Sequence, residues 1–364
     1  MEVTSVVKSV VPQSNLFEVL ESGMEHEQVV YCYDKETGLK AIIAIHNTVL
    51  GPSLGGTRMW MYENESLALN DVLRLSRGMT YKASISGLNL GGGKAVIIGD
   101  AKRDKTDAMM RKFGEFVNSL NGRYITAEDV GTSTADMVSV SQKTKHVTGL
   151  PELQGGGGDP SPVTAYGVYM GMKASAKDMW GSDSLSGKCI LVQGCGHVGQ
   201  NLVKYVTEEG AKVFVSDIHE DHLKKMVADY KAEVVDKDAV YDLEMDIYAP
   251  CALGATLNDI TIPKLKCAVV AGAANNQLHD EGKHGMMLLE KGIVYAPDFL
   301  INAGGLINVY SELQGYNREK ALEATRHIYN VTSEILKKAK TEKISTVNAA
   351  KQIAEQRIRD KKNQ

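Results

Sequence analysis

The stretch Cys189-Ile-Leu-Val-Gln-Gly-Cys-Gly-His-Val-Gly199 decides the fold of the second half of this chain. Five residues typical of a buried strand lead into a Gly-x-Gly-x-x-Gly turn, and a helical pattern follows over residues 200–209. In such a unit the first glycine makes the tight turn, the second lets a pyrophosphate reach the backbone, and the third lets helix and strand pack closely. The stretch therefore predicts a dinucleotide site at a helix N-terminus.

An acidic residue at the end of the next predicted strand supports this site. Residues 212–216 have a strand pattern, and Asp217 follows them directly. A carboxylate at this distance from the glycines accepts hydrogen bonds from a ribose 2′-hydroxyl, which favours NAD over NADP. The side chains of Cys195 and His197 are expected to have only packing or solvent roles. The predicted cofactor-binding residues of this unit are Gly194, Cys195, Gly196, His197, Val198, Gly199, Gln200 and Asp217.

More strand-like runs follow, over residues 247–249, 268–271 and 293–296, with helices or loops between them. This alternation predicts a parallel, doubly wound sheet of the Rossmann type.

The length of 364 residues and a glycine-rich break predict two α/β domains with the active-site cleft between them. Four glycines at residues 155–158 predict a hinge, and Ser161 before Pro162 predicts the N-cap of a helix that ends near residue 180. We expect an NAD-binding domain over residues 150–330. Residues 1–149 and 331–364 would form a substrate-binding and oligomerisation domain.

The first half and the end of the chain supply the other predicted elements. Strand patterns cover residues 28–33, 39–46, 57–62, 95–98 and 123–126, with helices predicted over 66–86 and 105–120. Residues 127–131 are predicted to form a polar turn that carries Asp129. Two charged helices, over 318–340 and 347–362, are expected to return to the first domain.

The composition excludes several classes of protein. A net charge of -4 provides no broad basic surface for nucleic acid. Five cysteines without CxxC spacing predict neither a metal site nor a disulfide framework, and they suit a reducing compartment. The absence of a signal-like N-terminus and of a long apolar run predicts a cytoplasmic protein without a membrane partner.

Two lysines, twelve residues apart in the first half, predict the chemistry. Lys82 lies in Gly78-Met-Thr-Tyr-Lys-Ala-Ser84, and Lys94 follows three glycines in Leu90-Gly-Gly-Gly-Lys-Ala95. A second ammonium near Lys94 would lower its pKa, so that it could act as a base near neutrality, while Lys82 stays charged and holds an anion. The segment is no phosphate-binding Walker loop, because leucine stands at position 88 and alanine follows the lysine.

The two halves together predict a dehydrogenase. A nicotinamide cofactor transfers hydride, so another group must handle a proton, and a lysine base suits an amine or alcohol donor. A cationic lysine suits a carboxylate on the same small molecule. Hydroxy-acid enzymes more often pair a histidine with an acid, and none of the nine histidines stands in such a local motif. The amino-acid substrate is therefore favoured over the hydroxy acid.

Five motifs then occur in a characteristic order from about residue 15 onward. They are Gly51-Pro-Ser-Leu-Gly-Gly-Thr-Arg-Met59, Gly87-Leu-Asn-Leu-Gly-Gly-Gly-Lys94, Thr126-Ala-Glu-Asp-Val-Gly-Thr132, Pro160-Ser-Pro-Val-Thr-Ala-Tyr-Gly-Val168 and Ile301-Asn-Ala-Gly-Gly305. Together they resemble the glutamate/leucine/phenylalanine/valine dehydrogenase superfamily. The resemblance implies reversible, NAD-dependent oxidative deamination of an L-amino acid to a 2-oxo acid and ammonia.

The resemblance also implies roles for residues of the first half. Lys94 would be the catalytic base, Lys82 would bind the substrate α-carboxylate, and Asp129 would assist proton transfer at the amine. Gly55 and Gly56 would line the substrate site through their backbone. Hydride would leave the α-carbon for the nicotinamide, and neutral Lys94 would then activate water for attack on the iminium.

In the second half, the resemblance implies that Thr164 lies near the nicotinamide. Either Asn275 or Asn276 would contact ribose or substrate, and the sequence does not choose between them.

Four apolar residues would line the pocket for the substrate side chain: Leu54, Ala127, Leu306 and Val309. Glutamate enzymes place a lysine and a serine where Leu54 and Val309 stand, so a second substrate carboxylate would be buried unpaired here. The pocket resembles the branched-chain type, with L-leucine and related amino acids as expected substrates. Phenylalanine dehydrogenase is the alternative, with glycine near Ala127 and leucine near Val309.

Three further points complete these expectations. Leu306 stands where valine is expected, and residues 155–158 hold more glycine than the usual serine-containing version. A catalytically silent NAD-binding regulator is an alternative from another class, because a fold does not establish a function. The resemblance suggests a homo-octamer, with a dimer as the alternative.

Overall fold

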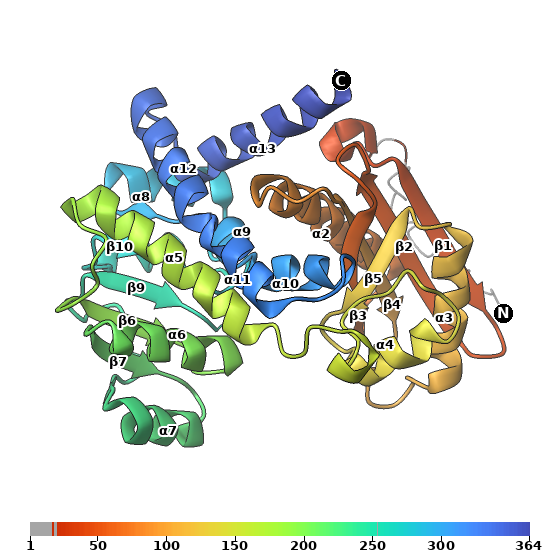
Figure 1. The fold of residues 1–364 in the computed structure, drawn as a ribbon, viewed down its shortest axis with the longest axis horizontal. Coiled ribbons are helices and arrows are strands. Elements are labelled where there is room, and N and C mark those ends of the chain that lie inside the picture. The colour runs from red at the N-terminus through yellow and green to blue at the C-terminus, as the bar shows by residue number, and fades with distance from the viewer. Residues whose placement is uncertain (1–16, 18–19, 253) are drawn as a thin grey trace, which may run out of the picture.

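A five-stranded sheet forms the core of the first half of the computed structural model (Figure 1). The structure describes residue 17, residues 20–252 and residues 254–364, so the beginning of the predicted first domain, residues 1–16, lies outside the described residues. The strand order is β1-β2-β4-β3-β5. The strands are β1 (Gln28–Asp34), β2 (Leu39–Asn47), β3 (Ser53–Trp60), β4 (Gly91–Ile98) and β5 (Tyr124–Glu128).

Helices cover both faces of this sheet. Strand β2 is antiparallel to β1 and β4, whereas β3 is parallel to β4 and β5. Because side chains alternate along a strand, Ile42 of β2 packs with helix α2 (Glu65–Ile85) on one face. Ile43 packs on the other face with α3 (Asp107–Ser119), next to which lies α4 (Thr134–Ser141). The double burial explains the nearly continuous apolar run of β2.

A parallel six-stranded sheet forms the second half, with the order β11-β10-β9-β6-β7-β8. The strands are β6 (Cys189–Gln193), β7 (Lys212–Ser216), β8 (Glu233–Val234), β9 (Ile247–Pro250), β10 (Val269–Val270) and β11 (Val294–Tyr295). The predicted doubly wound sheet and the two-domain α/β fold are confirmed. Strand order reverses between β6 and β9, which is where ligands bind in such sheets.

The helices of the second half are α5 (Ser161–Trp180), α6 (His197–Glu208), α7 (Glu220–Tyr230), α8 (Glu281–Glu290), α9 (Asp298–Ile301) and α10 (Gly304–Glu312). Among the described residues there are also two short 3₁₀ turns, η2 (Glu152–Gln154) and η3 (Ile262–Lys264), and the π-turn η1 (Leu20–Met24). Helix α5 packs against α6 and follows the linker between the two halves.

One carboxylate ties this linker down. Glu312, at the end of α10, accepts hydrogen bonds from the backbone N–H groups of Gly149 and Gly157, each at 2.9 Å. A Cβ on Gly157 would lie 2.5 Å from the side-chain amide nitrogen of Asn308, so a larger residue there would require that side chain to shift. Glu312 therefore bonds α10 to the linker at two points, one before residue 150 and one within the predicted hinge of residues 155–158.

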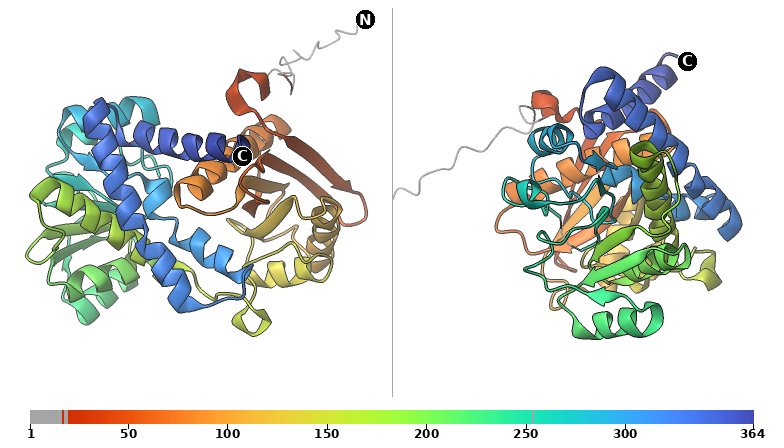
Figure 2. Two further views of the ribbon diagram at one scale, coloured as in Figure 1. Left: turned by 45° about the horizontal axis from the view of Figure 1, so that its top comes forward. Right: turned by 90° about the vertical axis from the view of Figure 1, so that its left-hand side faces the viewer.

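Three helices end the chain: α11 (Arg318–Arg326), α12 (Ile328–Glu342) and α13 (Thr346–Lys362). Helix α12 packs against α5, and α13 continues toward α2 of the first half (Figures 1 and 2). There the hydroxyl of Ser84 donates to the Ala354 carbonyl at 2.7 Å. The single helix predicted over 318–340 is wrong, because the chain divides at His327.

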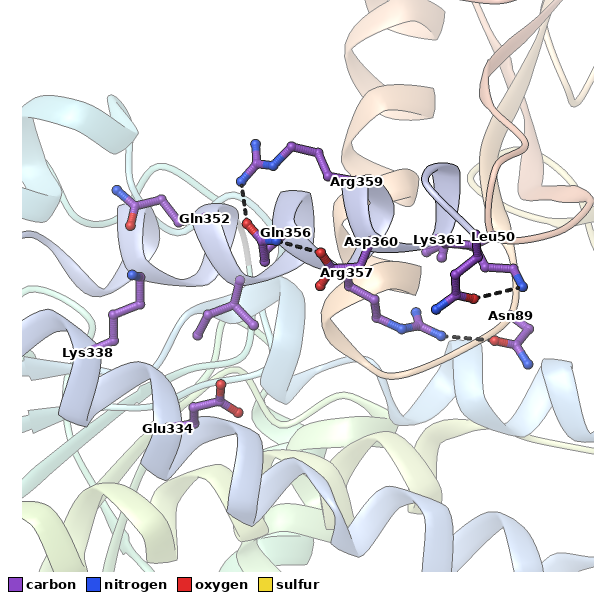
Figure 3. A pocket seen from close by; sticks show the side chains of 12 residues that line it. Leu50, Asn89, Glu334, Lys338, Gln352, Gln356, Arg357, Arg359, Asp360 and Lys361 are labelled. Carbon is purple, nitrogen blue, oxygen red and sulfur yellow. Dashed lines mark hydrogen bonds between the residues drawn. The ribbon is translucent and has the colours of Figure 1, made fainter.

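A groove of about 910 Å³ opens beside α13 (Figure 3). Arg357 on its wall donates to the carbonyls of Ser84, Gly87 and Leu88 and to the side chain of Asn89. These carbonyls are at the end of α2 and just beyond it, where a helix lacks partners of its own. The groove thus contains the cap of α2, to which both terminal nitrogens of Arg357 donate.

Several predicted boundaries are wrong. Lys94 was expected at the start of a strand, but it lies within β4, paired with Ala44, because β2 and β3 hold the three glycines in the sheet. Strand β3 begins at Ser53 and ends at Trp60, and β5 extends through Glu128 into the predicted turn. Ser161 is the first residue of α5 and not its N-cap, and its N–H donates to Asp159 at 2.9 Å.

Candidate active site

Glycine contacts bring the two predicted lysines toward one another. Lys82 lies on α2 and Lys94 on β4. A Cβ on Gly92 would lie 2.1 Å from the hydroxyl oxygen and 2.2 Å from the backbone nitrogen of Thr80. Only glycine permits this close approach of α2 to β4. The charge of Lys94 is therefore near enough to lower the pKa of Lys82.

The glycines of β3 place Asp129 in the same region. A Cβ on Gly55 would lie 1.7 Å from the Gly93 carbonyl oxygen, and one on Gly56 would lie 2.9 Å from the Cβ of Asp129. The sequence predicted Gly55 and Gly56 as backbone contributors to the substrate site. The structure places Gly55 against β4, which carries Lys94, and Gly56 against the end of β5, which Asp129 follows.

Lys94 and Asp129 form a buried ion pair. The Nζ atom of Lys94 lies 3.0 Å from Oδ1 of Asp129, and only 6% of the lysine side chain is exposed. Burial lowers the pKa of Lys94 below its usual value, against the opposing effect of Asp129. The sequence argument attributed this shift to a second ammonium. Burial is instead the largest cause, and the positive neighbour that adds to it is Arg58.

Asp129 is ionised although it is largely enclosed. Burial alone would raise its pKa, but the charges and hydrogen bonds of Lys94 and Arg58 hold it below the usual value. Its backbone N–H donates to the hydroxyl of Thr132 at 2.9 Å, which in turn donates to the Thr57 carbonyl at 2.8 Å. These bonds tie the segment after β5 to β3.

Lys82 faces charges from both halves of the molecule. Burial lowers its pKa to about 8, with Lys94 lowering it further and Asp298 and Asp129 opposing. Asp298 is buried at the beginning of α9, which packs against α2, and its carboxylate accepts the N–H groups of Gln277 and Phe299. Burial raises the pKa of Asp298. The sequence reading missed this residue because nothing local marks it.

Arg58 was also missed, although it stands in a quoted motif. Its Nε donates to Oδ2 of Asp129 at 2.9 Å, and its Nη1 donates to Asp71 on α2, also at 2.9 Å. The motif around residues 51–59 was interpreted through its glycines. A signal was present, since an arginine two residues after Gly56 on a buried strand needs a partner.

The predicted apolar pocket residues come from both halves. Leu54 of β3 and Leu306 of α10 belong to one buried cluster, and Val309 packs against it partly exposed. Ala127 is buried on β5, paired with Gly56. The apolar lining therefore lies next to the strands that carry the charged groups.

The glycine loop after β6 has the geometry that a dinucleotide requires. Gly194 has a φ of 103°, and a Cβ on Gly199 would lie 1.9 Å from the Gly194 carbonyl oxygen. Gly196 caps α6 without a side-chain bond, and a Cβ there would meet nothing within 4 Å. The open space at this helix N-terminus fits a pyrophosphate.

The other loop residues take different positions. Cys195 is buried, His197 is exposed, and Val198 packs partly buried against the core. The side-chain amide of Gln200 donates to the Cys195 carbonyl at 2.8 Å. Helix α6 begins at His197, three residues earlier than predicted.

Asp217 is fixed at the end of β7 beside this loop. Its carboxylate accepts the backbone N–H of Cys195 at 2.5 Å and that of His219 at 2.8 Å. Burial raises its pKa, but these bonds and His222 outweigh burial and keep it ionised. The predicted ribose acceptor is thus placed next to the predicted pyrophosphate loop.

The remaining predicted residues are Thr164 on α5 and the two asparagines in the loop after β10. The hydroxyl of Thr164 donates to the Pro160 carbonyl at 3.0 Å, and a Cβ on Gly305 would lie 3.0 Å from its oxygen. The side chain of Asn275 accepts a hydrogen bond from Asn302 at 2.8 Å. Asn276 has a φ of 52°, and its carbonyl accepts the N–H of Ala255. Asn302 was missed, although it lies in the motif of residues 301–305.

Two family models match the two halves of the chain. The family described as "Glu/Leu/Phe/Val dehydrogenase, dimerisation domain" matches residues 26–146. The family described as "Glutamate/Leucine/Phenylalanine/Valine dehydrogenase" matches residues 155–221 and 215–364. The chain belongs to the Glu/Leu/Phe/Val dehydrogenase family. The predicted family resemblance is confirmed, and with it an amino-acid dehydrogenase.

Three members of this dehydrogenase family show how similar the chain is to known proteins. Leucine dehydrogenase from Geobacillus stearothermophilus is 56% identical over 343 residues, which cover 94% of this chain and 93% of that protein. Leucine dehydrogenase from Bacillus cereus is 55% identical over 348 residues, covering 96% and 94%. The crystal structure of L-tryptophan dehydrogenase from Nostoc punctiforme superimposes with a TM-score of 0.86 at 46% identity, covering 96% and 100%.

The described residues contain no candidate for a membrane-spanning helix. Among the helices that the structure describes, none is long and apolar enough to cross a membrane.

Proposed function

We propose that the chain catalyses the reversible, NAD-dependent oxidative deamination of L-leucine and other branched-chain L-amino acids to 2-oxo acids and ammonia. The observation that carries this proposal is the buried Lys94–Asp129 pair, 3.0 Å apart, beside a second lysine and an apolar lining. The similarity to leucine dehydrogenases over nearly the whole chain supports it.

Lys82 would bind the substrate carboxylate. With a pKa of about 8, it carries its proton in most molecules at neutral pH. A carboxylate at the site would raise this pKa further, because an opposite charge favours the charged form. Binding of the amino acid therefore fixes Lys82 as the ammonium.

Lys94 would be the base and Asp129 its proton partner. A buried lysine with a lowered pKa is neutral in a larger fraction of molecules and can accept a proton from water. The water then attacks the α-carbon of the iminium substrate. Asp129, within hydrogen-bond distance of Lys94, would exchange protons with the amine as ammonia leaves.

The second half would hold NAD. The open N-terminus of α6 at Gly196 would receive the pyrophosphate, and Asp217 would accept from a ribose hydroxyl. Bound NAD supplies the hydride acceptor for the α-carbon. Thr164 would lie near the nicotinamide. Of the two asparagines, Asn275 is the better candidate for a ligand contact, because Asn302 orients its side chain while the backbone of Asn276 serves a turn.

The pocket would select apolar side chains. Leu54, Ala127, Leu306 and Val309 offer no partner for a second carboxylate, so glutamate would bury an unpaired charge. Valine is one methylene smaller than leucine, isoleucine is its isomer, and one methylene in such a pocket changes the transition-state energy by about 1–3 kcal/mol. We therefore expect leucine, valine and isoleucine to react together.

The proposed organisation extends to the domains and their assembly. Contacts of α13 with α2 support placing residues 346–362 with the first domain (1–149 and 331–364), whereas α12 packs on α5 of the cofactor domain (150–330). We propose a cytoplasmic homo-oligomer, an octamer by resemblance and a dimer as the alternative. Exposed Tyr31 and Tyr33 on the edge strand β1 support self-association.

Lys94→Ala tests the proposed reaction. NADH formation is measured with L-leucine, L-valine, L-phenylalanine and L-glutamate, and Lys102→Ala serves as an exposed-lysine control. We expect leucine turnover by the wild type and the control, and a loss of about 10²–10⁴-fold in Lys94→Ala, the usual contribution of a general base.

Faster turnover of phenylalanine than of leucine would favour the alternative function, that of a phenylalanine dehydrogenase. Protein that binds NADH but turns over none of the four amino acids would contradict the proposed function and favour the silent NAD-binding regulator.

A further inference from the structure

Behind the Lys94–Asp129 pair, alternating charges continue away from the site. The two oxygens of Asp129 are divided between two cations, with Lys94 on Oδ1 at 3.0 Å and Arg58 on Oδ2 at 2.9 Å. Arg58 then contacts Asp71 at 2.9 Å. Asp71 also accepts the hydroxyl of Tyr62 at 2.7 Å and the guanidinium of Arg74 at 3.0 Å. The chain of contacts runs from the buried base to the exposed face of α2.

The guanidinium of Arg58 suits this place because it is planar and cannot give up its proton. Its Nε and Nη1 atoms point to different carboxylates, so Asp71 on α2 fixes the plane in which Arg58 meets Asp129. Arg58 and Asp71 are both partly exposed, at 23% and 17% of their side chains. A lysine could carry the same charge but could not hold both carboxylates in one plane.

The charged and titratable groups that face the Lys94–Asp129 pair come from four elements. Strand β3 contributes Arg58, α2 contributes Asp71 and Lys82, β5 contributes the Tyr124 hydroxyl, and α9 contributes Asp298 through Lys82. Arg58 lowers the pKa of Lys94, whereas Asp71 raises it. Arg58 and Asp71 therefore shift the pKa of Lys94 in opposite directions.

We propose that Arg58, oriented by Asp71, is a positioning residue that holds Asp129 toward Lys94 and sets the pH at which Lys94 becomes a base. This inference rests on the proposed deaminase function. Arg58 does not touch the reacting atoms. It acts through Asp129, whose second oxygen it occupies.

Opposite pH shifts of kcat/KM for leucine deamination test this role. The acidic limb of the pH profile is the range in which kcat/KM rises as Lys94 loses its proton. In Arg58→Gln the cation is lost and Lys94 keeps its proton to higher pH, so this limb moves up by about one pH unit. In Asp71→Asn the carboxylate that raises the pKa of Lys94 is lost while Arg58 stays charged, so the acidic limb moves to lower pH. Arg58→Lys keeps the charge but loses the fork, so its limb stays near the wild-type position while kcat falls about tenfold or more.

Two controls separate this role from a structural one. Arg103→Gln removes an exposed arginine paired with Asp104, and neither the limb nor kcat should change. NADH binding by every variant reports that the cofactor half is intact. A Gln variant of Arg58 that does not fold leaves the decision to Asp71→Asn, whose downward shift no loss of stability produces.

The inference is overturned when Arg58→Gln and Asp71→Asn shift the limb in the same direction, or when neither shifts it. Its failure is distinct from failure of the proposed function. In the first case the wild type deaminates leucine with an acidic limb that the variants share, whereas in the second the wild type turns over no amino acid.

Discussion

Two glycine-rich segments, residues 91–93 of β4 and the loop of residues 194–199, use the same residue for opposite purposes. In β4 the missing side chains are replaced by protein, since Thr80 of α2 and the ring of Tyr124 occupy the space beside Gly92 and Gly93. In the loop, the space next to Gly196 is open. Glycine thus admits a neighbouring helix in one region and leaves room for a ligand in the other.

Alanine at Gly92 and alanine at Gly196 should change the stability of the protein by very different amounts. In Gly92→Ala the new Cβ meets the backbone of Thr80, which cannot move independently of α2, so the free energy of unfolding should fall by about 1–3 kcal/mol or more. In Gly196→Ala it should change by no more than about 0.5 kcal/mol, because φ is -68° and the space is empty. Urea unfolding measures both.

NADH titration completes this test. Gly196→Ala should weaken NADH binding, because its methyl group takes the space of the pyrophosphate. Equal losses of stability in the two variants would show that both segments are packed in the same way.

A pH titration examines Lys82, which α2 carries two residues after Thr80, the residue that Gly92 meets. Above pH 8 the free enzyme loses the Lys82 proton, so kcat/KM for leucine should fall about tenfold per pH unit. In Lys82→Arg this fall should vanish, since arginine stays charged. An alkaline limb that persists in Lys82→Arg would assign it to another group.

The same lowered pKa affects folding. Between about pH 8 and the usual 10.5, the unfolded chain binds more protons at Lys82 than the folded chain does. This lysine's contribution to stability therefore rises with pH across that window.

Asp217→Asn has the smallest expected effect and examines the open loop alone. The amide keeps one acceptor but loses the charge, so NAD affinity should fall about three- to tenfold, the value of one hydrogen bond. NADP, whose 2′-phosphate the carboxylate repels, should lose nothing. Isothermal titration with both cofactors measures the ratio, and an unchanged ratio would remove Asp217 from cofactor selection.

Local patterns were enough to place the parallel sheet, which followed from its repeats, and to put the glycine loop of residues 194–199 after β6 and Asp217 after β7. The roles of these residues and of the two lysines stay predictions. Sequence reasoning failed for Arg58 and Asp298. Arg58 meets Asp129 across 71 residues of sequence, and Asp298 approaches Lys82 only when α9 packs on α2. Such partners depend on tertiary packing, which no local pattern records.

Glu312 links the choice of substrate to the joint between the two halves. It lies on the helix that also carries Leu306 and Val309, and it bonds the linker at Gly149 and Gly157. A larger side chain at position 306 or 309 that pushes α10 aside also pulls on the linker. Redesign of the pocket through these two positions therefore also disturbs the hydrogen bonds that hold the linker.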